Sequence, residues 1–430
     1  MLKDIIENFQ ATRKVESGSL LEKLQQKALQ LLKSIDFPTT EDEEWKYTNI
    51  KKLVNTNFFV KNSDASYANL SHFFPQTECY RLVYVNGIFR EDLSSVLLDN
   101  NAVVHNLYEA YSSHQEIINQ YLDSSTLHTE TAFTAINAAW VKHGAFIYVR
   151  RGKALQKPVF LVHVQDTRSH SSLAQLRHLI IVEPGSQLSF VEQYYTLGQS
   201  ESLMNLVCEA FISQSARMNH VLLQTEKSLS SFVNFTQVHQ AQQSHYTNTT
   251  LTLGGQLVRN NLHVSLEGEH AEAFMYGLYM LKGNTHADNH TAVDHRVPNC
   301  HSNELYKGLL DERSTGVFNG KIFVRPNAQK TNAYQSNKNI LLSQQASMNT
   351  KPQLEIWADD VKCSHGTTTG ALEEEPLFYL QSRGICQEKA RALLIYAFVA
   401  EILEKIQPLF ARQAAEQMVK EWLGNQLEIA

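Results

Sequence analysis

Cys363 and His365 are the pair of residues in this sequence best suited to contact iron or sulfur. In an extended strand, residues two apart point to the same face, with Cα atoms about 6–7 Å from each other. A thiolate and a neutral imidazole are suitable iron ligands, and an adjacent imidazolium can lower the pKa of a thiol. An inert buried cysteine beside a hydrogen-bonded histidine is the commoner explanation of such a pair. Tetrahedral metal or cluster sites usually have four ligands, so a second chain would have to supply the others.

A second candidate metal site lies at His286, Asp288 and His290, which share one face if the segment is a strand. His286 and His290 would be the metal ligands of such a surface site. A polar ladder across the turns of a solenoid explains the same residues, and we prefer that interpretation.

Enzymatic signatures are few. The segment Gly316-Val-Phe-Asn-Gly320-Lys321 resembles a phosphate-binding loop, but its spacing is one residue short and the final Ser or Thr is missing. We therefore expect no ATP site in this chain. The alternative from another class is a β-helix carbohydrate-active enzyme, which needs paired carboxylates or a calcium site in a groove. Asp359-Asp360, or Asp288 with Asp294, are the candidates for that pair.

The composition is that of a folded protein long enough for two or three domains, with 430 residues and 43% hydrophobic content. Lys and Arg total 38 against 44 for Asp and Glu, so the basic excess that nucleic-acid binding requires is missing. The longest apolar run, residues 392–400, is well short of the roughly 20 residues that span a bilayer. With five scattered cysteines, no CxxC pair and no visible export signal, we expect a cytoplasmic protein without membrane or nucleic-acid partners.

Two regions with different periodicity precede the C-terminus. In the first 35 residues, apolar side chains recur at helical spacing and predict an amphipathic helix, and residues 39–47 predict a short second helix with an acidic first turn. Between about residues 140 and 360, short β-branched and aromatic runs separated by Gly, Pro or Asn predict many brief strands. The length of this span favours a solenoid over a sandwich, but no strict short repeat decides between them.

After Gly384 the apolar residues return to helical spacing as far as Pro408, and a last helix is predicted from Ala411 to Trp422. This wide apolar stripe either caps the open end of the β region or docks a partner. The stripe residues that we expect to contact such a partner are Leu393, Leu394, Phe398 and Ile402.

An ordered series of motifs between Tyr306 and Ile385 resembles the SufB/SufD family of iron–sulfur cluster assembly proteins. Upstream, the segment from Asp294 to Cys300 also resembles the family pattern, and Glu43-Glu44-Trp45-Lys46-Tyr47-Thr48 resembles its SufD branch. The motifs are Gly316-Val-Phe-Asn-Gly320-Lys321-Ile322, Ala328-Gln329-Lys330-Thr331-Asn-Ala-Tyr334-Gln335, Pro352-Gln-Leu354-Glu355-Ile356, Asp360-Val-Lys362-Cys363-Ser-His365-Gly366 and Leu377-Phe378-Tyr379-Leu380-Gln-Ser-Arg383-Gly384-Ile385.

The resemblance implies a mainly β fold, a right-handed parallel β-helix flanked by N-terminal and C-terminal α-helical regions. We place the mainly helical N-terminal region at residues 1–130, the β-helix core at 131–372 and the C-terminal helical region at 373–430.

The resemblance also implies a non-catalytic scaffold subunit of the SUF iron–sulfur cluster assembly complex. Family members pair as a SufB–SufD heterodimer and bind the SufC ATPase through their C-terminal helical regions, and a nascent cluster forms at the SufB–SufD interface. We therefore expect Cys363 and His365 to contact a transient Fe–S cluster or iron shared with a SufB-like paralogue, and this chain to assist iron entry. When alone, the chain could instead form a homodimer with a structural role.

Overall fold

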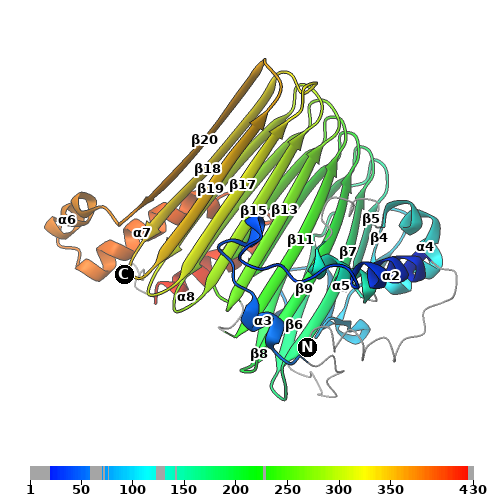
Figure 1. Ribbon diagram of the computed structural model, residues 1–430, viewed down its shortest axis with the longest axis horizontal. Helices are drawn as coiled ribbons and strands as arrows, with labels where there is room; N and C mark the ends of the chain where they lie inside the picture. The colour runs from blue at the N-terminus through cyan, green and yellow to red at the C-terminus, as the bar shows by residue number, and fades with distance from the viewer. Residues whose placement is uncertain are drawn as a thin grey trace.

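Two long sheets whose strands alternate along the chain form the centre of the molecule in this computed structural model (Figure 1). The structure describes residues 20–58, 70, 73–75, 77–122, 131–140, 143–225 and 229–424. The sheet that we name sheet I has the strand order β2-β1-β6-β8-β10-β12-β14-β16-β18-β20, and sheet II has the order β19-β17-β15-β13-β11-β9-β7-β5-β4-β3.

The strands of sheet I are β1 (Tyr80–Val85), β2 (Ile88–Phe89), β6 (Val159–Thr167), β8 (Gln187–Gly198), β10 (Arg217–Gln224), β12 (His245–Thr252), β14 (Glu272–Leu281), β16 (His301–Leu310), β18 (Thr331–Leu341) and β20 (Val361–Gly370). Those of sheet II are β3 (Leu97–Leu98), β4 (Ala102–Asn106), β5 (Ala145–Val149), β7 (Ser172–Val182), β9 (Ser202–Ile212), β11 (Ser230–Gln240), β13 (Leu257–Leu266), β15 (His286–His295), β17 (Thr315–Val324) and β19 (Ser347–Ile356).

From β5 onward, each strand pairs in parallel with the strand two further along the chain. In sheet I, for example, Glu304 of β16 lies opposite Gln335 of β18, and Ala333 of β18 lies opposite Cys363 of β20. Each turn of the chain thus adds one strand to each sheet, which defines a parallel β-solenoid. The solenoid is confirmed, and the sandwich that the strand pattern alone left open is excluded because sandwich strands pair antiparallel.

The space between the two sheets is filled by the side chains at alternate strand positions. Most of them are apolar and fully buried, such as Leu161, Ile180, Phe190, Phe232 and Tyr246. Because side chains in a strand alternate between faces, the other half of each strand faces the helices or solvent. A polar residue at an inward position is therefore enclosed in the solenoid and must find its partners there.

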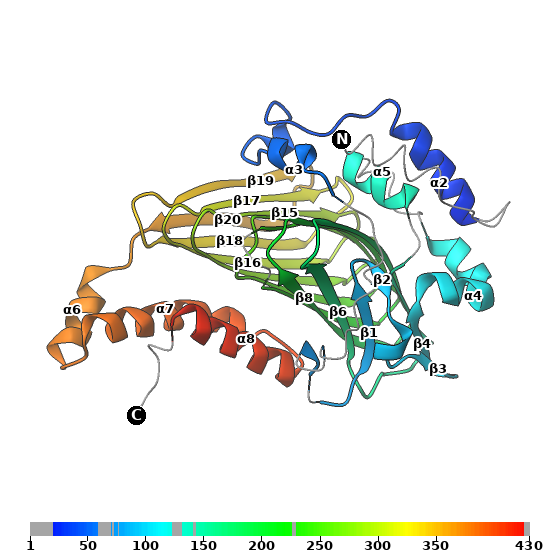
Figure 2. The ribbon, with the colours of Figure 1, turned by 90° about the horizontal axis from the view of Figure 1, so that it is seen from below.

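The helices cover the outer faces of both sheets (Figure 2). Helix α7 (Gln387–Leu403) and helix α8 (Leu409–Trp422) pack on sheet I, while α2 (Leu20–Leu31), α4 (Leu107–Tyr121) and α5 (Ala132–Ala139) pack on sheet II. The remaining helices are α3 (Lys51–Asn55) and α6 (Glu374–Ser382), with 3-10 turns at Glu43–Trp45 and Glu91–Leu93. None of the helices in the described part of the chain is long and apolar enough to cross a bilayer.

The predicted terminal helices are present at both ends. Helix α2 lies within the predicted helical segment of residues 1–35, of which residues 1–19 lie outside the described residues. Helices α7 and α8 match the two helices predicted after Gly384. The N-terminal region also contains β1 to β4, which extend the two sheets, so it is joined to the solenoid by hydrogen-bonded strands as well as by helix packing.

Candidate functional site

Cys363 and His365 lie on β20, the last strand of sheet I (Figure 1). Their Cα partners on β18 are Ala333 and Gln335, both of which are buried. Because β20 is extended, the two side chains leave the same face of the strand, the face that continues the interior of the solenoid. His365 is exposed and Cys363 is half-buried, since within the described residues no further turn of the solenoid covers them.

The Cys363 side chain packs against a small apolar cluster at this end of the solenoid. Burial in that cluster raises the pKa of the Cys363 thiol, and a hydrogen bond from the Ala333 backbone opposes the rise. In the free chain, desolvation of the thiolate is therefore the dominant effect on this pKa. The residues of the cluster are Ile322, Val324, Ala328, Ala333 and Ala358.

Gln335 and Glu304 continue the row of inward residues behind His365. The Nε2 group of Gln335 donates to Oε1 of Glu304 at 3.2 Å, and the Thr291 hydroxyl donates to Oε2 of Glu304 at 2.5 Å. Burial raises the pKa of Glu304 to about 7, although both hydrogen bonds favour its ionised form. An added Cβ at Gly320 would lie 2.2 Å from Nε2 of Gln335, so a larger residue there would displace the amide. Sequence reasoning missed Glu304, and its one signal is an acid at an inward position of a strand.

His286, Asp288 and His290 share one face of β15, as the strand pattern predicts, and all three contact other protein groups. Asp288 Oδ2 accepts hydrogen bonds from the Thr48 hydroxyl at 2.5 Å and from Arg259 Nη1 at 2.6 Å. Nε2 of His286 lies 2.9 Å from the same hydroxyl, and Nε2 of His290 lies 2.9 Å from Asp288 Oδ1. These contacts give the two histidines partners within the fold.

The group around Asp288 fastens the segment Glu43–Thr48 to the outer face of sheet II. The guanidinium of Arg259 stacks 3.7 Å above the Trp45 ring and donates to the Glu44 carbonyl. Glu44 pairs with Lys321 and Glu43 pairs with Lys351. The motif that resembles the SufD branch thus anchors the N-terminal segment to sheet II of the same chain.

The residues that suggested other chemistry have structural contacts too. The segment that resembles a phosphate-binding loop contains Lys321, but the two glycines of that segment lie inside strand β17 and so do not form a loop. Asp294, a candidate carboxylate for carbohydrate chemistry, accepts hydrogen bonds from Arg296 at 2.8 Å and Arg325 at 2.7 Å. Asp288 is buried and paired with Arg259.

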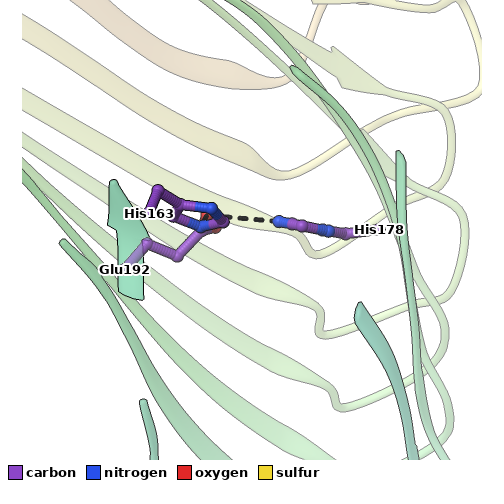
Figure 3. A group of neighbouring side chains, drawn as sticks. All are labelled: His163, His178 and Glu192. Atoms are coloured by element: carbon purple, nitrogen blue, oxygen red, sulfur yellow. Dashed lines mark hydrogen bonds and ion pairs between the residues drawn. The ribbon is translucent and has the colours of Figure 1, made fainter. Parts of the chain in front are cut away.

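Three other residues converge deep inside the solenoid, where His163, His178 and Glu192 form a group with ligand atoms within 4.8 Å of one another (Figure 3). Nε2 of His163 lies 3.2 Å, and Nε2 of His178 3.5 Å, from Glu192 Oε2. Nε2 of His220 lies 2.9 Å from Oε1, and the Tyr194 hydroxyl donates to Oε2 at 2.6 Å. Sequence reasoning missed this group, whose signal is a single polar residue within each of several apolar strands.

Proton positions argue against a metal at this interior group. Nδ1 of His178 accepts a hydrogen bond from the Ala145 backbone N–H at 2.9 Å, so in the neutral ring the proton is on Nε2, the atom that would bind the metal. Burial by itself would raise the pKa of Glu192, but hydrogen bonds from His163, His178 and His220 outweigh it and hold that pKa well below the usual value. We interpret the group as a closed centre in which imidazoles stabilise a buried carboxylate.

The C-terminal helices present a mixed surface. Ile402 is buried against sheet I and so contributes to packing of α7, whereas Leu393, Leu394 and Phe398 are half-buried. The most exposed aromatic side chains among the described residues of this region are Phe378 and Tyr379 on α6, which are 72% and 57% exposed.

Comparisons with known proteins agree with this architecture. Residues 163–398 match the family model described as SUF system FeS cluster assembly, SufBD core domain, and residues 2–161 match the SufBD protein N-terminal region. An iron–sulfur cluster assembly SufBD family protein of Synechocystis is 33% identical over 407 residues, which cover 92% of this chain and 89% of that protein. The iron–sulfur cluster assembly protein SufD of Escherichia coli is 30% identical over 404 residues, 94% of this chain and 92% of the relative. SufD of Bacillus subtilis is 25% identical over 320 residues, 73% and 72% of the two chains.

Both halves of the chain therefore match the same family in the expected order, and the chain belongs to the SufB/SufD family of iron–sulfur cluster assembly proteins, with SufD among its relatives.

Proposed function

We propose that this chain is a scaffold subunit, without catalytic activity of its own, that pairs with a SufB-like paralogue and contacts iron or a nascent Fe–S cluster through Cys363 and His365. The observation that carries the proposal is the position of this pair on β20, the terminal strand of sheet I. The interior face of the solenoid reaches the surface there, so a thiol and an imidazole are presented together to an incoming partner.

The end of the solenoid is suited to pairing with another chain. Strands β19 and β20 are the last members of their sheets, and in the described residues no further strand pairs with their outer edges. Unpaired N–H and C=O groups along an edge are a template for a strand of another chain. A partner solenoid docked there would supply the ligands that two residues cannot provide. The same edges would support a homodimer when the chain is alone.

The C-terminal helices are the proposed contact for a SufC-type ATPase. Helix α6 directly follows β20 and presents Phe378 and Tyr379, while α7 adds the half-buried Leu393, Leu394 and Phe398. Movement of these helices upon ATP binding by the partner would be transmitted to the edge at Cys363 and His365. ATP binding by the partner would then shift the equilibrium between a closed and an open interface toward the open state, through which iron enters.

Anaerobic cluster reconstitution on the co-expressed three-protein complex tests the proposed site. The Cys363→Ala, His365→Ala double variant should lower the initial rate of cluster formation at least about tenfold. Cys386→Ala is the matched control, because Cys386 is an exposed free cysteine outside the site. A double variant that assembles clusters at the normal rate and yield would refute the proposed role.

Copurification tests the docking helices. Phe378→Ala with Tyr379→Ala should abolish retention of the ATPase subunit, whereas Leu409→Ala, which removes a similarly exposed side chain from α8, should retain it. Leu394→Asp, checked for folding by circular dichroism, should likewise prevent binding. Unchanged retention of the ATPase in both variants would exclude this surface as its binding site.

Size measurement of the chain with and without a SufB-like chain would distinguish a homodimer from a heterodimer.

A further inference from the structure

The interior row behind His365 contains a buried carboxyl that the proposed function leaves without a role. The row crosses three neighbouring strands in register, from His365 on β20 to Gln335 on β18 and Glu304 on β16. Adjacent strands are about 4.8 Å apart, so the Cα atoms of Glu304 and His365 are separated by about 10 Å. This separation is too great for direct contact and short enough for a strong electrostatic effect.

Glu304 has neutral hydrogen-bond partners. It is fully buried, its hydrogen bonds come from Thr291 and Gln335, and in the described residues no cationic side chain forms an ion pair with it. A buried carboxyl without a counter-charge is costly for the fold, which makes it a candidate functional position. By contrast, the interior carboxylate of Glu192 is surrounded by three imidazoles.

Gln335 has an unused acceptor. Its Nε2 group donates to Glu304, but its buried Oε1 has no hydrogen-bond partner in the described residues. Because Gly320 has no side chain, it leaves the space that the Gln335 amide occupies. Because Gln335 is the register neighbour of His365, its free oxygen is suited to accept a proton of the imidazole or of a water molecule on a bound cation.

We propose that Gln335 and Glu304 extend the Cys363–His365 pair inward as positioning residues, with Gln335 orienting the imidazole and Glu304 supplying negative charge that favours a divalent cation. The inference rests on the proposed function, because it assigns the chemistry of the cation at that same site. It makes this end of the solenoid a place where Fe²⁺ is preferred over an uncharged sulfur species.

The pH dependence of cation binding distinguishes the proposed role of Glu304 from a purely structural one, because a residue that only supports the fold would not change that dependence. The other titratable groups that face this part of the interior are Tyr306 on β16, Tyr279 on β14, His295 on β15, and Cys363 and His365 on β20. All of them are present both in the wild type and in Glu304→Gln, so the ratio of the two affinities isolates Glu304. With a pKa of about 7, Glu304 is mostly neutral at pH 6 and mostly ionised at pH 8.

The experiment is an anaerobic titration of the co-expressed three-protein complex with Co²⁺, in which the partner supplies the ligands that this chain lacks, followed by the thiolate-to-cobalt charge-transfer band. We expect Glu304→Gln to weaken Co²⁺ binding about tenfold at pH 8 and about twofold at pH 6. Gln335→Met, which keeps the volume and removes the amide, should also weaken binding, and Glu304→Asp should recover part of the loss. Glu192→Gln is the matched control, a carboxyl-to-amide change at an inward position of the same sheet far from β20, with folding checked by thermal unfolding.

The outcomes separate the two proposals. If Glu304→Gln and Gln335→Met bind Co²⁺ like the wild type at both pH values while Cys363→Ala loses the band, the inward extension is refuted and the proposed site stands. If Cys363→Ala with His365→Ala also keeps wild-type binding, the proposed site itself fails.

Discussion

Two buried carboxyls on sheet I, Glu192 and Glu304, have the same placement and opposite environments. Both side chains are fully buried and point into the solenoid. Glu192 is hydrogen-bonded to His163, His220 and the Tyr194 hydroxyl and lies 3.5 Å from Nε2 of His178, whereas Glu304 accepts from Thr291 and Gln335 alone. Their pKa values are accordingly displaced in opposite directions, well below the usual value for Glu192 and up to about 7 for Glu304.

We infer from this difference that one interior holds a structural carboxylate at Glu192 and a functional one at Glu304. At Glu192 the surrounding turns enclose a set of donors that stabilises the charge, so the carboxylate contributes to folding. At Glu304 the solenoid ends two strands later: the next inward residue is the buried Gln335, and beyond it lie the half-buried Cys363 and the exposed His365 on β20. A carboxyl that has only neutral hydrogen-bond partners and lies near an open end can favour a cation bound there.

The largest expected effect is at the closed centre. Glu192→Leu removes the acceptor for His163, His178 and His220, which would leave buried donors unsatisfied. We expect the free energy of unfolding to fall by about 3–5 kcal/mol, measured by urea denaturation at pH 7.5. Glu272→Leu, at a half-exposed position on β14, should change it by no more than about 0.5 kcal/mol. Similar values for the two variants would contradict the structural role of Glu192.

Next in size is the pH dependence at Glu304. Its folded pKa lies above the unfolded value of 4.5, so between pH 4.5 and 7 the folded state binds more protons and stability decreases as pH rises. Glu304→Gln removes this loss, and its stability relative to the wild type should increase by about 2 kcal/mol between pH 5 and pH 8. Glu192 has the reverse sign, because its depressed pKa gives stability that is present above pH 4.5 and lost as pH falls below it. A parallel pH dependence of the wild type and Glu304→Gln would show that Glu304 is ionised throughout.

A smaller effect is expected from packing next to Glu304. Gly320→Ala places a Cβ 2.2 Å from the Gln335 amide and should displace it, at a cost of about 1 kcal/mol. Gly366→Ala on β20 is the matched control, since an added Cβ there would meet nothing within 4 Å, and it should change stability by no more than about 0.5 kcal/mol. Thermal unfolding of both variants measures the difference, and equal melting temperatures would show that the Gln335 amide can move without cost.

The smallest effect on stability is expected at the open end itself. His365 is exposed and Cys363 is half-buried, so His365→Ala should change the free energy of unfolding by less than about 0.5 kcal/mol. The same variant should impair cluster formation in the reconstituted complex. A loss of stability comparable to that of Glu192→Leu would mean that the closed centre around Glu192 and the open end at His365 do not differ as we infer.

Local patterns made much of this molecule predictable. Apolar residues at helical spacing located α7 and α8, and alternation along a strand placed Cys363 with His365, and His286 with Asp288 and His290, on common faces. These properties depend only on the period of a helix or a strand. The raised pKa of the Cys363 thiol could not be predicted from the sequence, because the apolar cluster around it is built from β17, β18 and the loops that follow β17 and β19.

By itself, the sequence determined the elements, the faces of their residues and, through its ordered motifs, membership in the SufB/SufD family. Only the tertiary structure decided which distant residues meet. His163, Glu192 and His220 converge because the register between turns aligns β6, β8 and β10, which the chain visits about 30 residues apart, and His178 faces them from β7 of the opposite sheet. No short repeat in the sequence indicates that register. The same register places Gln335 and Glu304 behind His365, and the end of the two sheets leaves that row open. Register depends on the packing of whole turns, so it arises only in the folded solenoid.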